Sequence, residues 1–437
     1  MKLAAALAPT LLLPRRASAA PSGLAGNAGG AIFFVLNGGA RTQCVFNGQA
    51  TTGVNPFGAL STGLSVPISA VQQGSGLDTP ALNRHLNLIA TAQHHNRTGN
   101  HDTGRIVACT GWEPEEAKAG ALTVLNYAFA TRAIPCVNIG NDTPATRIGA
   151  EISSTFAPIK INSPLNVDDL KKSLIDTRVS PAELERLDTL RFKMQDRFLR
   201  ETRYREPGDV PFFQRKAGEV AQQFNAAALD IRANASLGKY ADGTDVTNAG
   251  LRTTFGVTAT GGGSAMGARA MLALRLRQLG CAGIALSSDN WDLHSGEMDV
   301  LPAKAADVGK AIAGLVDHMS RIIDPVSGKT LLQTTVITAM TDFNRGNWSV
   351  ATGFNGNDGS DHSTNEDKTC FQCLPIIGGG LPGGRVLGEV QTNGSPATGS
   401  RRYETRQLIA TVLDLLGVAS ELFLPDTVMP LTSELTA

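Results

Sequence analysis

The sequence has no surplus of charge of either sign. Lys plus Arg and Asp plus Glu each number 39 in 437 residues, so the formal net charge is zero. Proteins that bind nucleic acid or an anionic membrane through charge need a basic surface. The balanced composition therefore argues against nucleic acid as a partner.

Aromatic residues and long apolar runs are also scarce. Aromatic residues make up only 5% of the chain, whereas glycine occurs 47 times, which indicates many tight turns and loops rather than a helical bundle. The apolar run "LAAALAPTLLL" at residues 3–13 is too short to span a bilayer as a permanent helix. No run of about 18 apolar residues follows it, so we expect no integral membrane segment in the mature chain.

The first 19 residues have the features of a secretory signal. Lys2 precedes the apolar run, and "ASA" at 17–19 has the small-x-small form that signal peptidase cuts. Twin-arginine signals carry their arginine pair before the apolar run, whereas Arg15 and Arg16 follow it here. We therefore expect residues 1–19 to be a truncated signal of this type and the mature protein to be exported, periplasmic or extracellular. An ordinary buried N-terminal helix is the alternative.

Six cysteines are present, and in an exported protein they favour disulfides. Cys370 and Cys373 in "TCFQC" could close a small loop. A lone CxxC lacks the second pair that a zinc ribbon needs, so a structural disulfide is favoured over metal or redox use. Two more bridges could come from the remaining cysteines, Cys44, Cys109, Cys136 and Cys281.

Strand-like and helical segments alternate, above all in the second half of the chain. The expected strands are 31–40, 133–140, 281–288 and 334–343, and the expected helices are 265–280, 303–323 and 406–417. This alternation predicts an α/β fold with a mostly parallel sheet flanked by helices on both faces. We expect one such domain over 20–437 with a helical insertion near 170–255. The segment 45–80 is expected to be a surface excursion, and 105–111 a strand or a helix edge.

Polar clusters follow several expected strands and hold five of the seven histidines. In parallel α/β sheets the loops at the carboxyl ends of the strands carry the chemistry. Carboxylate and imidazole side chains are ligands for zinc, manganese or calcium. The residues of interest are Asn37, His101, Asp102, Asp289, Asp292, His294, Asp361 and His362. Turn chemistry alone also concentrates Asp, Asn and His in surface loops, and that is the competing interpretation.

Two ions about 4 Å apart could hold the attacking and leaving oxygens of a phosphate or sulfate ester. Thr98 could then be the nucleophile, with its hydroxyl activated by a metal. Arg97 or Arg345 could neutralise the equatorial oxygens of the ester.

Four segments together resemble an exported bacterial family, the domain of unknown function 1501. They are "CAGIALSSDNWDLHSGE", "TAMTDFNRGN", "DGSDHST" and "GGGLPGGRVLGEV". The fold of that family resembles the alkaline phosphatase and sulfatase superfamily. The resemblance implies that Asp292 (or Asp289) and His294 bind one metal, that Asp361 and His362 bind a second, and that Thr98 lies near the place of the nucleophile.

The chain departs from the superfamily pattern at several ligands. Asn37 stands where the first strand of an active member ends in an acidic residue, and no histidine follows His362. Arg41 close to the site would repel a divalent cation. Two functions therefore stay open: metal-dependent hydrolysis of a small-molecule phosphate or sulfate ester, or a catalytically degenerate scaffold that binds a partner or an envelope glycan. The sequence leaves the oligomeric state open.

Overall fold

The centre of the protein is a nine-stranded sheet with the order β12-β4-β11-β10-β1-β9-β5-β6, in which β13 also pairs with β4. The computed structural model describes residues 26, 28–47, 55, 57–95, 99–130, 132, 134–167, 229–294, 296–324, 327–344, 371–391 and 396–437. The strands of this sheet are β1 (Gly30–Leu36), β4 (Leu86–Gln93), β5 (Cys136–Ile139), β6 (Ile159–Ile161), β9 (Gly283–Ser288), β10 (Thr335–Thr341), β11 (Gln372–Gly378), β12 (Val386–Leu387) and β13 (Tyr403–Glu404).

All pairings in this sheet are parallel except those of β11. β1 lies between β9 and β10, and both neighbours run parallel to it. β11 runs antiparallel to β10 on one side and to β4 on the other. The carboxyl ends of β1, β4, β5, β9 and β10 therefore share one edge of the sheet, where ligands bind in open α/β folds.

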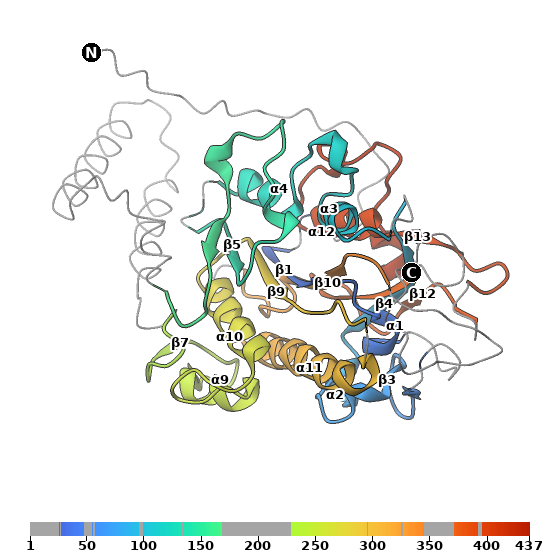
Figure 1. Cartoon of the computed structure of the whole chain (residues 1–437). Coiled ribbons are helices and arrows are strands. Elements are labelled where there is room, and N and C mark those ends of the chain that lie inside the picture. Colours follow the sequence, from blue (N-terminus) through green and yellow to red (C-terminus); the bar gives the residue numbers. More distant parts are fainter. Residues whose placement is uncertain are drawn as a thin grey trace, which may run out of the picture.

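Helices cover both faces of the sheet, as Figure 1 shows. One face carries α9 (Asn248–Phe255), α10 (Ala265–Gln278) and α11 (Glu297–Arg321), with the short α1 (Thr42–Val45) and α2 (Pro80–Asn83) beside them. The other face carries α3 (His101–Thr110), α4 (Ala121–Ala128), α12 (Thr405–Leu415) and α13 (Thr432–Thr436). The α/β fold with helices on both faces is thus confirmed.

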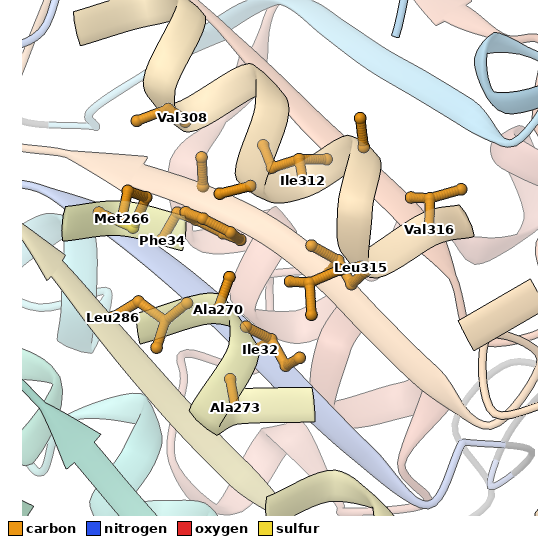
Figure 2. Close-up of a cluster of buried hydrophobic side chains, with 14 of the residues drawn as sticks. Ile32, Phe34, Met266, Ala270, Ala273, Leu286, Val308, Ile312, Leu315 and Val316 are labelled. Atoms are coloured by element: carbon orange, nitrogen blue, oxygen red, sulfur yellow. The ribbon is translucent and has the colours of Figure 1, made fainter. Parts of the chain in front are cut away.

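The central strand β1 shows why the sheet is covered on both sides. Every residue of β1 is buried, and alternate side chains enter two different cores. Ile32 and Phe34 pack with α10 and α11, as Figure 2 shows. Phe33 and Val35 enter the opposite core, where α3, α4 and α12 contribute.

Small elements complete the structure. They are β2 (Ala59–Leu60) with β3 (Ile68–Ser69), β7 (Ser236–Lys239) with β8 (Asp245–Thr247), and the 3-10 helices η1 (Ala70–Gln72), η2 (Pro114–Glu116), η3 (Pro144–Thr146), η4 (Ser154–Phe156) and η5 (Ser420–Leu422). The segment 45–80 was expected to be a surface excursion, but part of it is buried. Its Val66, Ile68 and Leu77 are fully buried and belong to the core that contains α11.

Most of the expected elements are present, with shifted ends. The helix expected at 303–323 begins earlier, at Glu297, and Pro302 lies in its second turn, where it removes one backbone hydrogen bond of the helix. The segment 105–111 is helical and belongs to α3. Two of the longer strands of the sheet were not expected: β4, and β11, which contains Cys373 and Pro375. The short strands β6, β12 and β13 were not expected either. A strand with a proline and no alternation is hard to recognise from sequence.

The disulfides expected among Cys44, Cys109, Cys136 and Cys281 are not formed. All four are free, fully buried thiols. Burial raises the pKa of Cys44, Cys109 and Cys281 to about 12, and it raises that of Cys136 as well. These cysteines behave as small core residues with protonated thiols. Cys370, the partner expected for Cys373, lies outside the described residues.

Two further expectations fall largely outside the part of the chain that the structure describes. They are the signal at 1–19 and most of the helical insertion near 170–255, of which only the end, with β7, β8 and α9, is described. None of the described helices is long and apolar enough to cross a membrane.

Candidate functional site

Polar residues follow four strands directly at the shared edge of the sheet. Asn37 follows β1, His94 follows β4, Asp289 follows β9 and Asp342 follows β10. His101 is the first residue of α3, which starts next to Asn100, the N-cap residue whose side chain accepts a hydrogen bond from the Thr103 amide at 3.1 Å. The parallel topology thus brings residues from four distant segments of the sequence to one place.

Asp342 is the buried anchor of this site. Its carboxylate oxygen Oδ2 accepts a hydrogen bond from the Gly38 amide at 3.1 Å and lies 2.9 Å from Nδ1 of His101. The side chain is only 1% exposed, and burial raises its pKa although His101 beside it acts in the opposite direction. The carboxylate therefore depends on these donors to stay ionised.

The outer side of His101 faces a second carboxylate. Nε2 of His101 lies 3.3 Å from Oδ1 of Asp292, and Nε2 of His294 lies 2.8 Å from the same oxygen. One ligand atom from each of the three residues lies within 4.8 Å of the other two. His101 is 23% exposed, while Asp292 and His294 are about half exposed, so the group opens to solvent.

The tautomer of His101 decides what this group can bind. A neutral imidazole that donates Nδ1–H to Asp342 presents a lone pair at Nε2. A lone pair facing the Asp292 carboxylate at 3.3 Å is repulsive unless a proton or a cation lies between them. Buried carboxylates behind metal-binding histidines fix the ring in this way. Two imidazoles and one carboxylate with solvent access match a catalytic zinc site with an open position.

Two buried oxygen atoms of residues that directly follow β1 and β10 have no hydrogen-bond partner within the described residues. They are Oδ1 of Asp342 and Oδ1 of Asn37. A buried acceptor without a partner costs free energy, so such atoms usually bind a water or an ion. Together with the His101–Asp292–His294 group, they make this edge suited to a cation.

The loops can pack this closely because two glycines leave space. A Cβ on Gly38, whose φ is +115°, would lie 2.4 Å from the Asp292 amide nitrogen. A Cβ on Gly104 of α3 would lie 2.3 Å from the carbonyl oxygen of Asp342. Real Cβ contacts are never this short. The glycines therefore allow the loop after β9 and the start of α3 to approach Asp342.

Asp289 does not join the group, although the sequence suggested it as a metal ligand. Its Oδ1 accepts a hydrogen bond from Nδ2 of Asn37 at 2.8 Å, and its Oδ2 accepts one from Nδ2 of Asn141 at 3.0 Å. Lys304 donates to its backbone carbonyl at 2.8 Å. Asn37, which replaces the expected acidic residue, thus ties Asp289 to the end of β1.

Arg41 was expected to repel a divalent cation at the site, but its charge is neutralised. Its guanidinium is fully buried and donates two hydrogen bonds to the Glu297 carboxylate, from Nε at 3.2 Å and from Nη2 at 2.6 Å. A bidentate pair of this kind neutralises both charges locally. The expectation failed because the sequence does not show that Glu297, at the start of α11, folds back onto the loop after β1.

The remaining expected site residues divide into two sets. Asp102 points away: its side chain is 84% exposed and pairs with Arg105 on the surface of α3. The others, Arg97, Thr98, Arg345, Asp361 and His362, lie outside the described residues. Asp292 and His294 lie next to each other, and the third member of their group is His101.

The importance of Asp342 for the site could not be recognised from the sequence. Asp342 lies in the polar cluster after β10, but nothing in the sequence marks it as more important than its neighbours. Its position directly after a fully buried strand was the available signal. His94 was likewise one of five clustered histidines. It is 3% exposed, and burial lowers its pKa to about 4, which keeps the ring neutral.

The chain belongs to a family of unknown function. Residues 76–428 match the family model described as protein of unknown function (DUF1501), which confirms the family expected from the motifs. No curated protein matches the chain.

Several solved structures are similar to the chain at low identity. Ps i-CgsB is 11% identical, with a TM-score of 0.40 over 93% of this chain and 76% of that one. The alkaline phosphatase from the Antarctic bacterium TAB5 is 10% identical, with a TM-score of 0.36 over 90% and 99%. The phosphonate monoester hydrolase SpPMH from Silicibacter pomeroyi is 12% identical, with a TM-score of 0.37 over 93% and 76%. Scores this low leave the activity to be argued from the site itself.

Proposed function

We propose that this member of the DUF1501 family is an exported, metal-dependent hydrolase of phosphate or sulfate esters. The observation that carries the proposal is the group of His101, Asp292 and His294, in which the buried Asp342 holds Nδ1 of His101 at 2.9 Å. A surface ion pair needs no buried carboxylate behind it, whereas a metal-binding histidine usually has one.

Each residue has a separate role in this proposal. Nε2 of His101, Nε2 of His294 and a carboxylate oxygen of Asp292 would hold the ion. Asp342 orients the ring of His101 and supplies negative charge from behind. A divalent ion held there would polarise the ester and lower the pKa of a water molecule. Imidazole ligands favour zinc or manganese over calcium, which prefers oxygen ligands only.

The attacking group and the contacts to the ester are proposed from the sequence. Thr98 lies three positions before His101 in the chain and remains the proposed nucleophile. Arg97 and Arg345 remain the proposed contacts to the ester oxygens, and Asp361 and His362 remain the proposed ligands of a second ion. Within the described residues, the geometry supports one ion.

A metal-loading experiment tests the proposal. The mature protein is stripped with chelator, dialysed and titrated calorimetrically with zinc and with manganese, and the loaded protein is assayed on p-nitrophenyl phosphate and p-nitrophenyl sulfate. We expect one ion to bind per chain and hydrolysis of at least one ester. The variants His294→Ala and Asp292→Asn should lose metal binding and hydrolysis. Asp102→Asn, at an exposed side chain, should behave like the wild type.

The second candidate function is a non-catalytic envelope protein that binds a glycan. Asn37 supports this second candidate. Its side-chain amide donates a hydrogen bond to the Asp289 carboxylate, so one acidic ligand fewer is available to a metal at the edge of the sheet. Stoichiometric metal binding with no hydrolysis across a panel of esters would favour this candidate. If the wild type binds neither zinc nor manganese, the hydrolase proposal is wrong.

A further inference from the structure

His94 is a buried histidine that does not contact the candidate metal site directly. Hydrogen bonds connect it to that site through Asp342. His94 follows β4 directly and is 3% exposed. In the sheet β11 lies between β4 and β10, so His94 and Asp342 emerge from strands that are not direct neighbours. Even so, Nε2 of His94 is within hydrogen-bond distance of the backbone carbonyl oxygen of Asp342.

The second nitrogen of His94 is held from the opposite side. Its Nδ1 lies 2.8 Å from the hydroxyl oxygen of Thr405, the first residue of α12. Thr405 is placed there by the sheet, because β13 pairs with the end of β4 in the register Glu404 to Gln93. The residues that follow this pair, Thr405 and His94, are therefore neighbours. Both side chains are buried, so water does not compete for this contact.

These two contacts fix the tautomer. A carbonyl oxygen only accepts hydrogen bonds, so Nε2 of His94 must carry the proton and donate it to Asp342. Nδ1 is then an acceptor, and the Thr405 hydroxyl donates to it. Nε2 of Gln372 on β11 lies 3.2 Å from Nε2 of His94, but both nitrogens are donors in this tautomer, so this contact is no hydrogen bond. The ring is thus held by two segments, the residue after β10 and the start of α12.

The carbonyl of Asp342 is also confined from the side of α3. A Cβ on Gly104 would lie 2.3 Å from this oxygen, so the backbone of α3 contacts it closely. With the peptide held between His94 and α3, the Asp342 side chain projects toward Gly38 N and His101 Nδ1, at 3.1 and 2.9 Å. One continuous series of hydrogen bonds runs from Thr405 through His94 and Asp342 to His101.

We propose that His94 is a positioning residue: by holding the Asp342 peptide, it aims the Asp342 carboxylate at Nδ1 of His101 and so presents Nε2 of His101 to the metal. This inference rests on the proposed function for its last step only. His94 reaches neither Asp292 nor His294, and it acts entirely through Asp342.

The first test needs no metal. In protein labelled with 15N-histidine, the Nδ1–H proton of His101, held by a buried carboxylate, should give a slowly exchanging downfield resonance, assigned by its loss in His101→Asn. His94→Leu removes the donor to the Asp342 carbonyl and should shift or broaden that resonance. His94→Gln places an amide N–H near the position of Nε2 and should restore it.

The second test measures zinc affinity by competition with a chromophoric chelator. We expect His94→Leu to bind zinc roughly 10- to 100-fold more weakly than the wild type, which is the usual effect of losing an outer-shell partner. His94→Gln should recover most of this loss. The matched control is His318→Leu, which removes another buried histidine, one on α11 whose Nδ1 contacts the Tyr240 hydroxyl. It should leave both readouts unchanged.

The outcomes separate this inference from the proposed function. If the wild type binds no zinc but the His101 resonance responds to His94→Leu and recovers in His94→Gln, the proposed function fails and the positioning role stands. An unchanged resonance in a folded His94→Leu overturns the inference. Should His94→Leu not fold, Thr405→Val, which removes only the donor to Nδ1, must still shift the resonance, and no shift there overturns the inference as well.

Discussion

Arg41 and Glu297 form a buried bidentate ion pair between residues 256 positions apart in the chain. Nη2 of Arg41 lies 2.6 Å from Oε2 of Glu297, and the two side chains are 0% and 2% exposed. The pair joins the loop after β1, which carries Asn37 and Gly38, to the start of α11, which follows the loop carrying Asp292 and His294. Two loops of the candidate site are therefore held at a fixed separation.

Breaking this pair should be costly. Glu297→Gln keeps the size of the side chain but leaves the Arg41 charge buried without its counter-charge, so we expect a loss of about 3–5 kcal/mol in the free energy of unfolding. Denaturant unfolding measures it. The control is Asp317→Asn, which breaks the exposed pair with Arg321 and should cost less than about 1 kcal/mol. Equal small losses in both variants would contradict the buried, charge-balanced role of Glu297.

Asp342 should control metal affinity without being a ligand of the ion itself. Asp342→Asn still offers an oxygen to Nδ1 of His101 but loses the negative charge, so we expect zinc to bind roughly 10- to 100-fold more weakly. Calorimetric titration of the chelator-stripped protein measures the change. Asp102→Asn on the outer surface of α3 should bind zinc like the wild type. An unchanged affinity in Asp342→Asn would mean that the carboxylate serves only the fold.

Bound metal should also stabilise the folded protein. At a free zinc concentration 100 times the dissociation constant, binding to the native state alone adds about 2.7 kcal/mol to the free energy of unfolding. We expect this gain in the wild type, measured by unfolding with and without zinc. His294→Ala should show none of it. A gain that persists in His294→Ala would place the stabilising ion elsewhere on the chain.

Gly38 should be intolerant of any side chain. Its φ of +115° strains other residues, and an added Cβ would lie 2.4 Å from the Asp292 amide nitrogen. Gly38→Ala must push away the loop that carries Asp292, so both stability and zinc affinity should fall. Gly328 is the matched control, because its φ is +71° but no atom of the described residues beyond its chain neighbours lies within 4 Å of an added Cβ. Gly328→Ala should cost about 1 kcal/mol and leave zinc binding intact.

The fold was largely predictable because its central strands are fully buried apolar runs between helices of clear period. β1, β9, β10, α11 and α12 can be recognised in this way. β11 does not, because its antiparallel pairing and its proline have no local signature. The site was predictable only in part for a related reason. Asp292 and His294 lie two positions apart and can be seen in the sequence, whereas Asp342 and His101 join them only through the order of the strands.

Stability should fall as the pH drops from about 6.5 to 4, and His318 should account for part of the loss. Burial lowers the pKa of His318 from 6.5 to about 4 in the folded protein. Between these values the unfolded chain binds a proton that the native state excludes, so stability is full above pH 6.5 and declines below it. A shift of this size corresponds to roughly 3 kcal/mol at 1.36 kcal/mol per pKa unit.

His318→Phe isolates this contribution. The ring lies between Tyr240 and Phe255, with centroid distances of 5.8 Å to each, so phenylalanine can fill the space. The variant loses the hydrogen bond between Nδ1 of His318 and the Tyr240 hydroxyl, which lowers stability by a similar amount at every pH in this window. The free energy of unfolding, followed from pH 7 to pH 4, should therefore fall less steeply in the variant than in the wild type. Parallel curves would show that His318 is protonated as readily in the folded protein as in the unfolded chain.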